Sequence, residues 1–488
     1  MSVVKKPKNA DYNLIVIGAG SAGLVSAYIA ATVKAKVLLI EKHRMGGDCL
    51  NTGCVPSKAF IKSAKVKHLL DNADDYGIEA TSGQVNFAAV MERVQKIIKT
   101  VEPHDSVERY QSLGVECVQG EAKIVSPYGV EVNGKTYTTR NIIVASGAAP
   151  LIPPIPGLDQ VPYLNSDNLW ELRELPRQLL VVGAGPIGCE LAQSFQRLGA
   201  KVTLVDTSQH VMAKEDADVS AYMEKVFEQE GIKLLLQHRM ETFFKRDGRD
   251  WASLKVEKSG QTQNVEIPFD KVLVAVGRKA NSAGFGLEEL GIEITQSGTI
   301  KVDDYLRTNL KNIFACGDIA GPYQFTHMAS HQAWYATVNA LFGPFKKFKV
   351  DYSIVPWATF TDPEVAHVGL GETEAKKRNI PYEIASYGID DLDRAIADSE
   401  DQGFIKVLTK PGSDKVLGAT IVSYHASDLI TEFITAIKRG IGLNKILGTI
   451  HIYPTVSEAN KYLAGNWKRD HAPQGLLKFA EKFHKWRR

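Results

Sequence analysis

Two stretches of the 488-residue chain, one ending at Glu41 and the other at Asp206, repeat the same pattern. Each reads as a short apolar strand, a glycine-rich turn, a helix-forming run and a second apolar strand that ends in a carboxylate. The spacing is shared as well, because the acid stands 23 positions after the first glycine of the turn, Gly18 or Gly183. Strand, helix and strand around such a turn are typical of a βαβ unit. The chain is therefore expected to contain two dinucleotide-binding folds.

The first turn has the form GxGxxG, with Gly18, Gly20 and Gly23. The first glycine permits the tight turn, and the second lets backbone N–H groups approach a pyrophosphate at the positive end of the helix. The third allows the helix to pack closely on the strand. Glu41 can accept hydrogen bonds from a ribose diol, so strand, turn, helix and acid together predict nucleotide binding.

The second turn repeats this arrangement with Gly183, Gly185 and Gly188. Asp206 also bears on the choice of nucleotide, because a carboxylate repels a 2′-phosphate and the next three residues supply no arginine to receive one. NADH is therefore expected in preference to NADPH, although Lys214 or a distant arginine could still reach a phosphate.

Composition limits the kind of protein. The length suits about three domains, and 44% hydrophobic residues with a net charge of +2 are those of an ordinary globular protein. We expect no nucleic-acid partner and, because no apolar run reaches 18 residues, no membrane span. The first ten residues lack an apolar secretory core, and five cysteines form no disulfide scaffold, so a cytoplasmic setting with reduced thiols is expected.

Cys49 and Cys54 stand five residues apart in GGDCLNTGCVPSK, directly before a helical stretch. A helix dipole and Lys58 would stabilise their thiolates, which favours a redox-active pair. Zinc ligation is the main alternative, but no second pair of cysteines or histidines nearby completes four ligands, so no metal site is predicted. The remaining cysteines are expected to be buried small residues: Cys117, Cys189 and Cys316.

From about residue 12 to about residue 465 the sequence resembles the class I flavoprotein disulfide reductases, the family of dihydrolipoamide dehydrogenase, glutathione reductase and mercuric reductase. GGDCLNTGCVPSK is close to the family's GGTCxNxGCxPSK, and both glycine turns, VASGAAP, VGRKAN and TNLKNIFACGDIAG also match. The resemblance implies an α/β fold with two Rossmann-like dinucleotide-binding domains and a C-terminal α+β dimerisation domain. It also implies FAD in the first domain, NAD(H) in the second, and a homodimer that completes the active site.

We expect the following domain limits: 1–157 and 281–349 for the two parts of the FAD domain, 158–280 for the NAD(H) domain, 350–470 for the dimerisation domain and 471–488 for a basic amphipathic tail. A segment with four prolines, residues 148–156, marks the first crossover. The tail can place Leu476, Phe479, Ala480 and Phe483 on one side with basic residues opposite. We expect it to pack against the body, with a membrane-surface or partner role as the alternative.

By the same resemblance, Asp318 bonds the ribityl chain of the flavin, and helix-terminal amides at residues 326–328 face its pyrimidine ring. Lys58 lies beside flavin N5 and pairs with Glu190. Cys54 exchanges electrons with the flavin and Cys49 attacks the substrate. The remaining expected cofactor contacts are Lys58, Ala122, Ser146, Gly147, Thr326 and His327 for FAD, and Glu190 and Gly277 for NAD(H).

One position departs from the family pattern. The disulfide reductases use a histidine before Pro-Thr, contributed by the other subunit, as acid and base. Here HIYPTVSE places Tyr453 there, while Glu458, which orients that histidine in the family, is present. A tyrosine with a pKa of about 10 is a poor base at pH 7. His451 could replace it, but two residues along a strand displace the side chain by about 7 Å, which favours an interface or core histidine.

Three functions stay open. The first is an NADH:disulfide oxidoreductase of dihydrolipoamide dehydrogenase type with altered proton handling. The second is a reductase of metal ions, mercuric or cupric, or of quinones; mercuric reductase also lacks the histidine, but its C-terminal cysteine pair is missing here. The third is a non-catalytic thiol redox sensor. In the first two the partner is a small-molecule electron acceptor, and NADP(H) is a less favoured cofactor than NAD(H).

Overall fold

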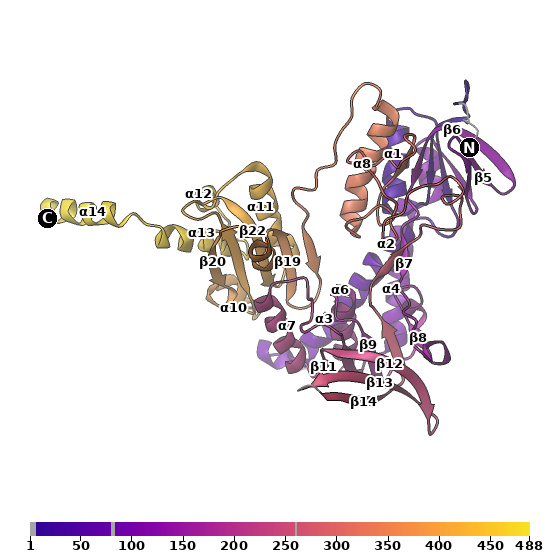
Figure 1. The fold of residues 1–488 in the computed structure, drawn as a ribbon. Coiled ribbons are helices and arrows are strands. Elements are labelled where there is room, and N and C mark those ends of the chain that lie inside the picture. Colours follow the sequence, from indigo (N-terminus) through magenta and orange to yellow (C-terminus); the bar gives the residue numbers. More distant parts are fainter. Residues whose placement is uncertain (1–5, 80–82, 259–260) are drawn as a thin grey trace.

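The computed structural model describes residues 6–79, 83–258 and 261–488. Figure 1 shows three parts built on sheets, with the first dinucleotide domain at the upper right, the second below it and the C-terminal domain to the left. The predicted α/β architecture, two Rossmann-like domains followed by an α+β domain, is confirmed.

The first domain is built on a sheet of order β3-β2-β1-β6-β5-β4, with β17 on the other side of β6. Strands β1, β2, β3, β6 and β17 are parallel, and β4, β5 and β6 form an antiparallel meander. The strands are β1 (Tyr12–Ile17), β2 (Val37–Glu41), β3 (Val115–Gln119), β4 (Lys123–Ser126), β5 (Gly129–Val132), β6 (Lys135–Val144) and β17 (Ile313–Ala315). The apolar run in β1 is buried on both faces, as the centre of a parallel sheet requires.

Helices beside this sheet position the chemistry of the domain. Helix α1 (Ser21–Thr32) follows the first glycine turn and packs beside α8 (Thr326–Phe342) in Figure 1. The cysteine motif forms a short helix, α2 (Gly47–Asn51), and the start of α3 (Cys54–Asp71), which packs on α4 (Phe87–Val101). Because β17 returns to the first sheet and leads into α8, late residues of the chain lie beside early ones.

The second domain repeats the parallel arrangement in the order β11-β10-β9-β15-β8. Its elements are β8 (Tyr163–Leu164), β9 (Gln178–Val182), α6 (Pro186–Arg197), β10 (Lys201–Val205), α7 (Ala217–Gln229), β11 (Lys233–Leu235) and β15 (Lys271–Val274), with an antiparallel sheet of β12 (His238–Arg246), β13 (Arg249–Lys258) and β14 (Gln261–Phe269). The two crossings between the domains pair with each other as β7 (Ala148–Pro150) and β16 (Arg278–Ala280).

The C-terminal domain has an antiparallel sheet of order β18-β19-β22-β21-β20. Its elements are β18 (Trp357–Thr359), β19 (Glu364–Gly369), α9 (Glu372–Lys377), β20 (Glu383–Gly388), α10 (Asp393–Ala397), β21 (Phe404–Thr409), β22 (Val416–Ser423), α11 (Ala426–Arg439), α12 (Leu443–Leu447) and α13 (Glu458–Asp470). Helices α11, α12 and α13 bury their apolar faces against this sheet.

The three parts share a hydrophobic core. One continuous cluster of buried side chains includes Phe60 and Met91 from the first domain, Phe195 from the second, and Val365 and Val422 from the C-terminal domain. Contacts of this kind fix the domains against one another.

Helix α14 (Gln474–Arg487) corrects our expectation that the tail packs against the body. It buries no residue, and Figure 1 shows it projecting far from the rest of the chain. The reason is local: α13 ends at Asp470, and Pro473, which has no backbone N–H, stands before α14, so the helix is not continued onto the domain surface. Among the described residues no helix is both long and apolar enough to cross a bilayer.

Candidate functional site

The two cysteines lie at the starts of adjoining helices. Cys49 is in α2, and Cys54 is the first residue of α3. This segment packs directly on the first glycine turn, since a Cβ added to Gly47 would come within 2.6 Å of the Cα of Gly20. In this structure both cysteines are thiols, Cys54 being exposed and Cys49 half-buried.

Thr326, the first residue of α8, joins the cysteine pair from the other end of the sequence. Its Oγ1 lies 3.3 Å from Cys54 Sγ. A hydrogen bond from the Cys49 thiol, together with Thr326 and the charge of Lys58, lowers the pKa of Cys54 to about 6. The same hydrogen bond and burial raise the pKa of Cys49. The pair therefore carries one proton and one negative charge near neutral pH, with the thiolate on Cys54 at the positive ends of α3 and α8.

Lys58 lies one turn after Cys54 and forms the expected ion pair with Glu190 of α6, with 2.8 Å between Nζ and Oε2. The other carboxylate oxygen of Glu190 accepts a 2.9 Å hydrogen bond from the backbone N–H of Phe360. The Lys58 ammonium also lies 4.2 Å from the centre of the Phe360 ring. Glu190 is buried, so these two donors are what make its charge tolerable.

The glycines of both turns separate into two kinds. A Cβ on Gly23 or Gly188 would fall 1.7 or 1.8 Å from the carbonyl oxygen of the first glycine, so the packing of helix on strand demands glycine there. Gly20 and Gly185 are different: their φ angles, −79° and −76°, suit any residue. A Cβ would have no protein atom within 4 Å at Gly185 and only one, at 3.8 Å, at Gly20. Glycine at these two positions keeps the helix start open, and the cradle fits a dinucleotide pyrophosphate at each site.

The two terminal acids are held alike. Glu41 accepts a 2.6 Å hydrogen bond from the N–H of Ala19, inside the first turn, and Asp206 accepts one of 2.6 Å from Ala184 in the second. Asp206 also accepts a 2.7 Å hydrogen bond from the N–H of Ser208. Both carboxylates are therefore fixed at the end of the second strand and lie against their glycine turns, where a ribose would be bound.

Asp318 is linked to the cysteine helix through Arg278, a residue that our sequence reasoning missed. The guanidinium group lies 3.5 Å from Asp318, pairs with Asp48 of α2 and donates 2.7 Å to the carbonyl of Ala148. Burial raises the pKa of Asp318, and Arg278 opposes that effect. The signal was present in the matched VGRKAN turn, but nothing in the spacing pointed to Asp48.

The other expected cofactor contacts lie in loops between strands, except His327, which is the second residue of α8. Ser146 and Asn281 are locked by two reciprocal 2.9 Å hydrogen bonds, each side chain to the other's backbone carbonyl. His327 bonds the carbonyl of Pro356 through Nε2, and burial lowers its pKa. Ala122 is buried, while Gly147 and Gly277 adopt positive φ angles. Their cofactor contacts stay predictions.

Tyr453 lies in the C-terminal domain, on an exposed apolar loop that includes Ile450 (95% exposed) and Ile452. Its hydroxyl donates a 3.0 Å hydrogen bond to Asp393, and this bond raises the tyrosine pKa above its ordinary value. Tyr453 is therefore ionised, and so able to accept a proton, even less often at neutral pH than a free tyrosine.

His451 and Glu458 do not face Tyr453's hydroxyl. The buried imidazole of His451 is 3.2 Å from both carboxylate oxygens of Glu432 in α11, which is hydrogen-bonding geometry within the C-terminal domain. Glu458, also buried, accepts 3.4 Å hydrogen bonds from the N–H of Thr455 and the hydroxyl of Tyr462. Their catalytic roles stay predictions.

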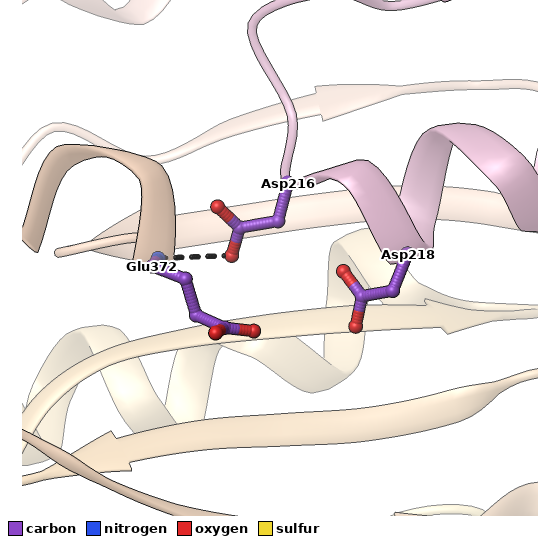
Figure 2. Close-up of side chains that lie close together, drawn as sticks. All are labelled: Asp216, Asp218 and Glu372. Atoms are coloured by element: carbon purple, nitrogen blue, oxygen red, sulfur yellow. Dashed lines mark hydrogen bonds between the residues drawn. The ribbon is translucent and has the colours of Figure 1, made fainter. Parts of the chain in front are cut away.

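A separate cluster of carboxylates joins the second and C-terminal domains. Figure 2 shows Asp216, Asp218 and Glu372 converging, a spacing that could suit a metal ion. The Lys406 ammonium occupies the position between them, at 3.0, 2.7 and 2.9 Å. The cluster is thus an ion pair network, buried at Lys406 and Asp216 and exposed at Asp218, that fastens α7 to α9 and β21.

Comparison with known proteins gives consistent matches. Residues 12–333 match the family model described as pyridine nucleotide-disulphide oxidoreductase, and residues 355–464 match its dimerisation domain. The chain is 34% identical over 462 residues to mercuric reductase of Bacillus cereus, covering 95% of this chain and 72% of that protein. It is also 34% identical over 456 residues to dihydrolipoyl dehydrogenase of Chlamydia muridarum, covering 92% and 95%.

Solved structures agree in fold. LpdA from Mycobacterium tuberculosis superposes with a TM-score of 0.84 at 26% identity, covering 93% of this chain and 99% of that one. The Cu(II) complex of the HOCl-induced flavoprotein disulfide reductase RclA from Escherichia coli gives 0.82 at 23% identity, covering 95% and 99%.

Proposed function

Because the chain belongs to the pyridine nucleotide-disulphide oxidoreductase family of flavin-dependent enzymes, we propose that it is an NADH:disulfide oxidoreductase of dihydrolipoyl dehydrogenase type. The observation that carries the proposal is the Cys54 site. A thiol with a pKa of about 6, held at two helix starts and beside Lys58, is built to exist as a thiolate at neutral pH. Structural cysteines have no need of such surroundings.

FAD at the first glycine turn would accept a hydride from NADH at the second and supply the electron pair that reduces a Cys49–Cys54 disulfide. The residues of this chain hold the participants in place. Gly20 and Gly185 leave room for backbone N–H groups to bind the pyrophosphates. Glu190 fixes the Lys58 ammonium one turn from Cys54. The thiolate forms on Cys54, and the proton stays on the half-buried Cys49. We assign Cys49 to attack on substrate by the family resemblance, and its proton would pass to the leaving sulfur as the Cys49–substrate bond forms.

The nucleotide is proposed to be NADH. Asp206 is fixed by the N–H groups of Ala184 and Ser208, so its charge cannot swing away from the ribose position. A 2′-phosphate there would lie against a carboxylate, at a cost in affinity that a ribose hydroxyl avoids.

The five thiols of the chain, all free in this structure, suit a reducing, cytoplasmic setting.

We propose a homodimer as the working unit. The exposed loop that carries Ile450, Ile452 and Tyr453 lies in the matched dimerisation domain and presents a large apolar surface. In a dimer, each chain would cover this loop of the other chain and so remove the apolar surface from water. In that arrangement Tyr453 of one chain would reach the cysteine pair of the other.

The balance of the proposed reaction requires proton delivery. NADH, one proton and one disulfide give NAD⁺ and two thiols, so a group must protonate the leaving sulfur. Tyr453 could donate its proton for this purpose, but its raised pKa makes it a reluctant acid and leaves almost no tyrosinate to act as a base in the reverse direction. We therefore expect thiol–disulfide exchange to be slow in both directions and to be faster in Tyr453→His.

Tyr453 also favours a second candidate function, the reduction of metal ions. A thiophilic metal ion needs no proton in order to leave: NADH and Hg(II) give NAD⁺, Hg(0) and one proton, and two Cu(II) ions give two Cu(I) with the same proton. A site with Tyr453 hydrogen-bonded to Asp393 in place of a histidine suits that chemistry. Mercuric reductases are among the relatives of this chain.

The two candidates differ in their protons, which gives a direct test. NADH oxidation would be measured with lipoamide, glutathione disulfide, a quinone, Cu(II) and Hg(II), for wild type, Cys49→Ser and Tyr453→His, with proton uptake or release followed in weak buffer. Lipoamide turnover with uptake of one proton, abolished in Cys49→Ser, supports the proposal. Metal turnover with proton release, and lipoamide turnover gained only in Tyr453→His, supports the second candidate. No acceptor above background would contradict both and leave a redox sensor.

A further inference from the structure

Helix α14 is amphipathic and its apolar face is bare. Leu476, Phe479, Phe483 and Trp486 are spaced by three, four and three residues, so they line one side of the helix. The ring centres of Phe483 and Trp486 lie 6.2 Å apart, which places these two side chains together. All four are exposed to water, Phe479 at 67% and Trp486 at 81%. Large aromatic side chains do not stay in water by preference.

The opposite side of the same helix is strongly basic. Residues 474–488 contain five lysines and arginines and a single acid, Glu481, whose carboxylate is paired with Lys485 at 2.6 Å. The remainder of the chain carries a small net negative charge, because the whole protein is only +2. Positive charge is therefore concentrated on α14.

Within the described chain, α14 is not packed against the rest of the protein. It buries no residue, and its hydrogen bonds and ion pairs connect residues of the helix and its own N-terminal flank. The break at Pro473 sets it apart from α13, so it projects from the C-terminal domain as Figure 1 shows.

We propose that α14 binds the surface of a membrane rich in anionic lipid, lying in the interface with Leu476, Phe479 and Phe483 against the acyl chains and Trp486 at the headgroup level. A short helix with aromatic and leucine side chains on one face and lysines and arginines on the other has the composition of interfacial helices. The cations would meet lipid phosphates, and Trp486 would sit at the headgroup level that tryptophan prefers.

A second copy of the chain is the other occupant to consider. A protein surface that covered the apolar face would also have to neutralise the net charge of about +4 on residues 474–488, which an anionic bilayer does along the whole helix. The charge complementarity therefore favours the lipid surface. The proposal concerns attachment alone and does not depend on which acceptor the enzyme reduces.

The test uses the full-length holoenzyme and sedimentation with vesicles of phosphatidylcholine, with and without about 30% phosphatidylglycerol. Phe479→Glu and Trp486→Glu each place a charge on the apolar face. Leu477→Glu is the matched control, because it makes the same change of charge on the same helix but off that face. NADH oxidation, unchanged in all three variants, shows that each is folded.

Wild type should bind the anionic vesicles, with binding weakened by salt and much reduced on phosphatidylcholine alone. Phe479→Glu and Trp486→Glu should each weaken binding more than about tenfold, because a large apolar side chain is lost from the interface, and Leu477→Glu should not. Absence of vesicle binding by wild type, or equal binding by all variants, would overturn the proposal. A loss of dimer mass in Phe479→Glu without vesicle binding by wild type would assign α14 to a second copy instead.

Discussion

The hydroxyl of Thr326 should add to the hydrogen bond from Cys49 in lowering the pKa of Cys54, and Thr326→Val removes that hydroxyl while keeping the shape of the side chain. The bond spans 3.3 Å from Oγ1 to Sγ and stabilises the thiolate. A hydrogen bond to a charged group contributes about 1.5–3 kcal/mol, and about 1.4 kcal/mol corresponds to one pKa unit. At the lower end, which suits a sulfur acceptor, the Cys54 pKa should rise from about 6 to about 7.

The assay is a pH titration of the reduced holoenzyme. It follows the long-wavelength charge-transfer absorbance that arises between the Cys54 thiolate and the flavin. The band is lost as pH falls through the Cys54 pKa, so in Thr326→Val it should disappear at higher pH than in wild type. Thr326→Ser, which retains a hydroxyl, should titrate like wild type. If the valine variant had the same midpoint as the serine variant, within about 0.3 of a pH unit, the hydrogen bond would not be what stabilises the thiolate.

Three further results are expected. Lys406→Met should lower the free energy of unfolding by about 3 kcal/mol, because it removes the cation shared by Asp216, Asp218 and Glu372; Lys301→Met, at the exposed ion pair with Glu293, should leave the denaturation midpoint unchanged. Burial raises the pKa of Glu215 to about 7, so the folded state keeps a proton that the unfolded state loses near pH 4.5. The free energy of unfolding of wild type, relative to that of Glu215→Gln, should therefore fall by about 2–3 kcal/mol between pH 5 and 8. If urea denaturation gave the same difference between the two proteins at every pH, this reasoning would be contradicted. Asp206→Ser should raise kcat/KM for NADPH relative to NADH at least about tenfold, and an unchanged ratio in steady-state assays would show that Asp206 does not select the nucleotide.

The sequence was most informative where local spacing determines geometry. The glycine turns at Gly18 and Gly183 predicted both parallel sheets, because the third glycine of each turn leaves no alternative packing of helix on strand. The amphipathic pattern of α14 was also predicted correctly as a helix. Its packing was not, since an apolar face shows that something covers a helix but not what covers it.

Contacts between distant parts of the chain were harder to foresee. Arg278 and Asp48 are 230 residues apart, and they meet only because β16 pairs with β7 beside the cysteine helix. The imidazole of His451 contacts Glu432 for a similar reason, because α11 packs against the loop that follows α12. No period or motif in the sequence encodes such encounters. The Lys58–Glu190 pair was predicted because the family resemblance supplied what spacing could not.

Glu190 has a consequence for how the protein unfolds. It stands on a helix of the second domain, yet its two carboxylate oxygens bind Lys58 of the first domain and the backbone of Phe360, next to the C-terminal sheet. Undocking any one domain would break at least one of these two contacts, in addition to opening the shared core. The three parts therefore form one cooperative unit, so that unfolding should proceed in a single transition and the second domain, cut out alone, should not keep its native stability.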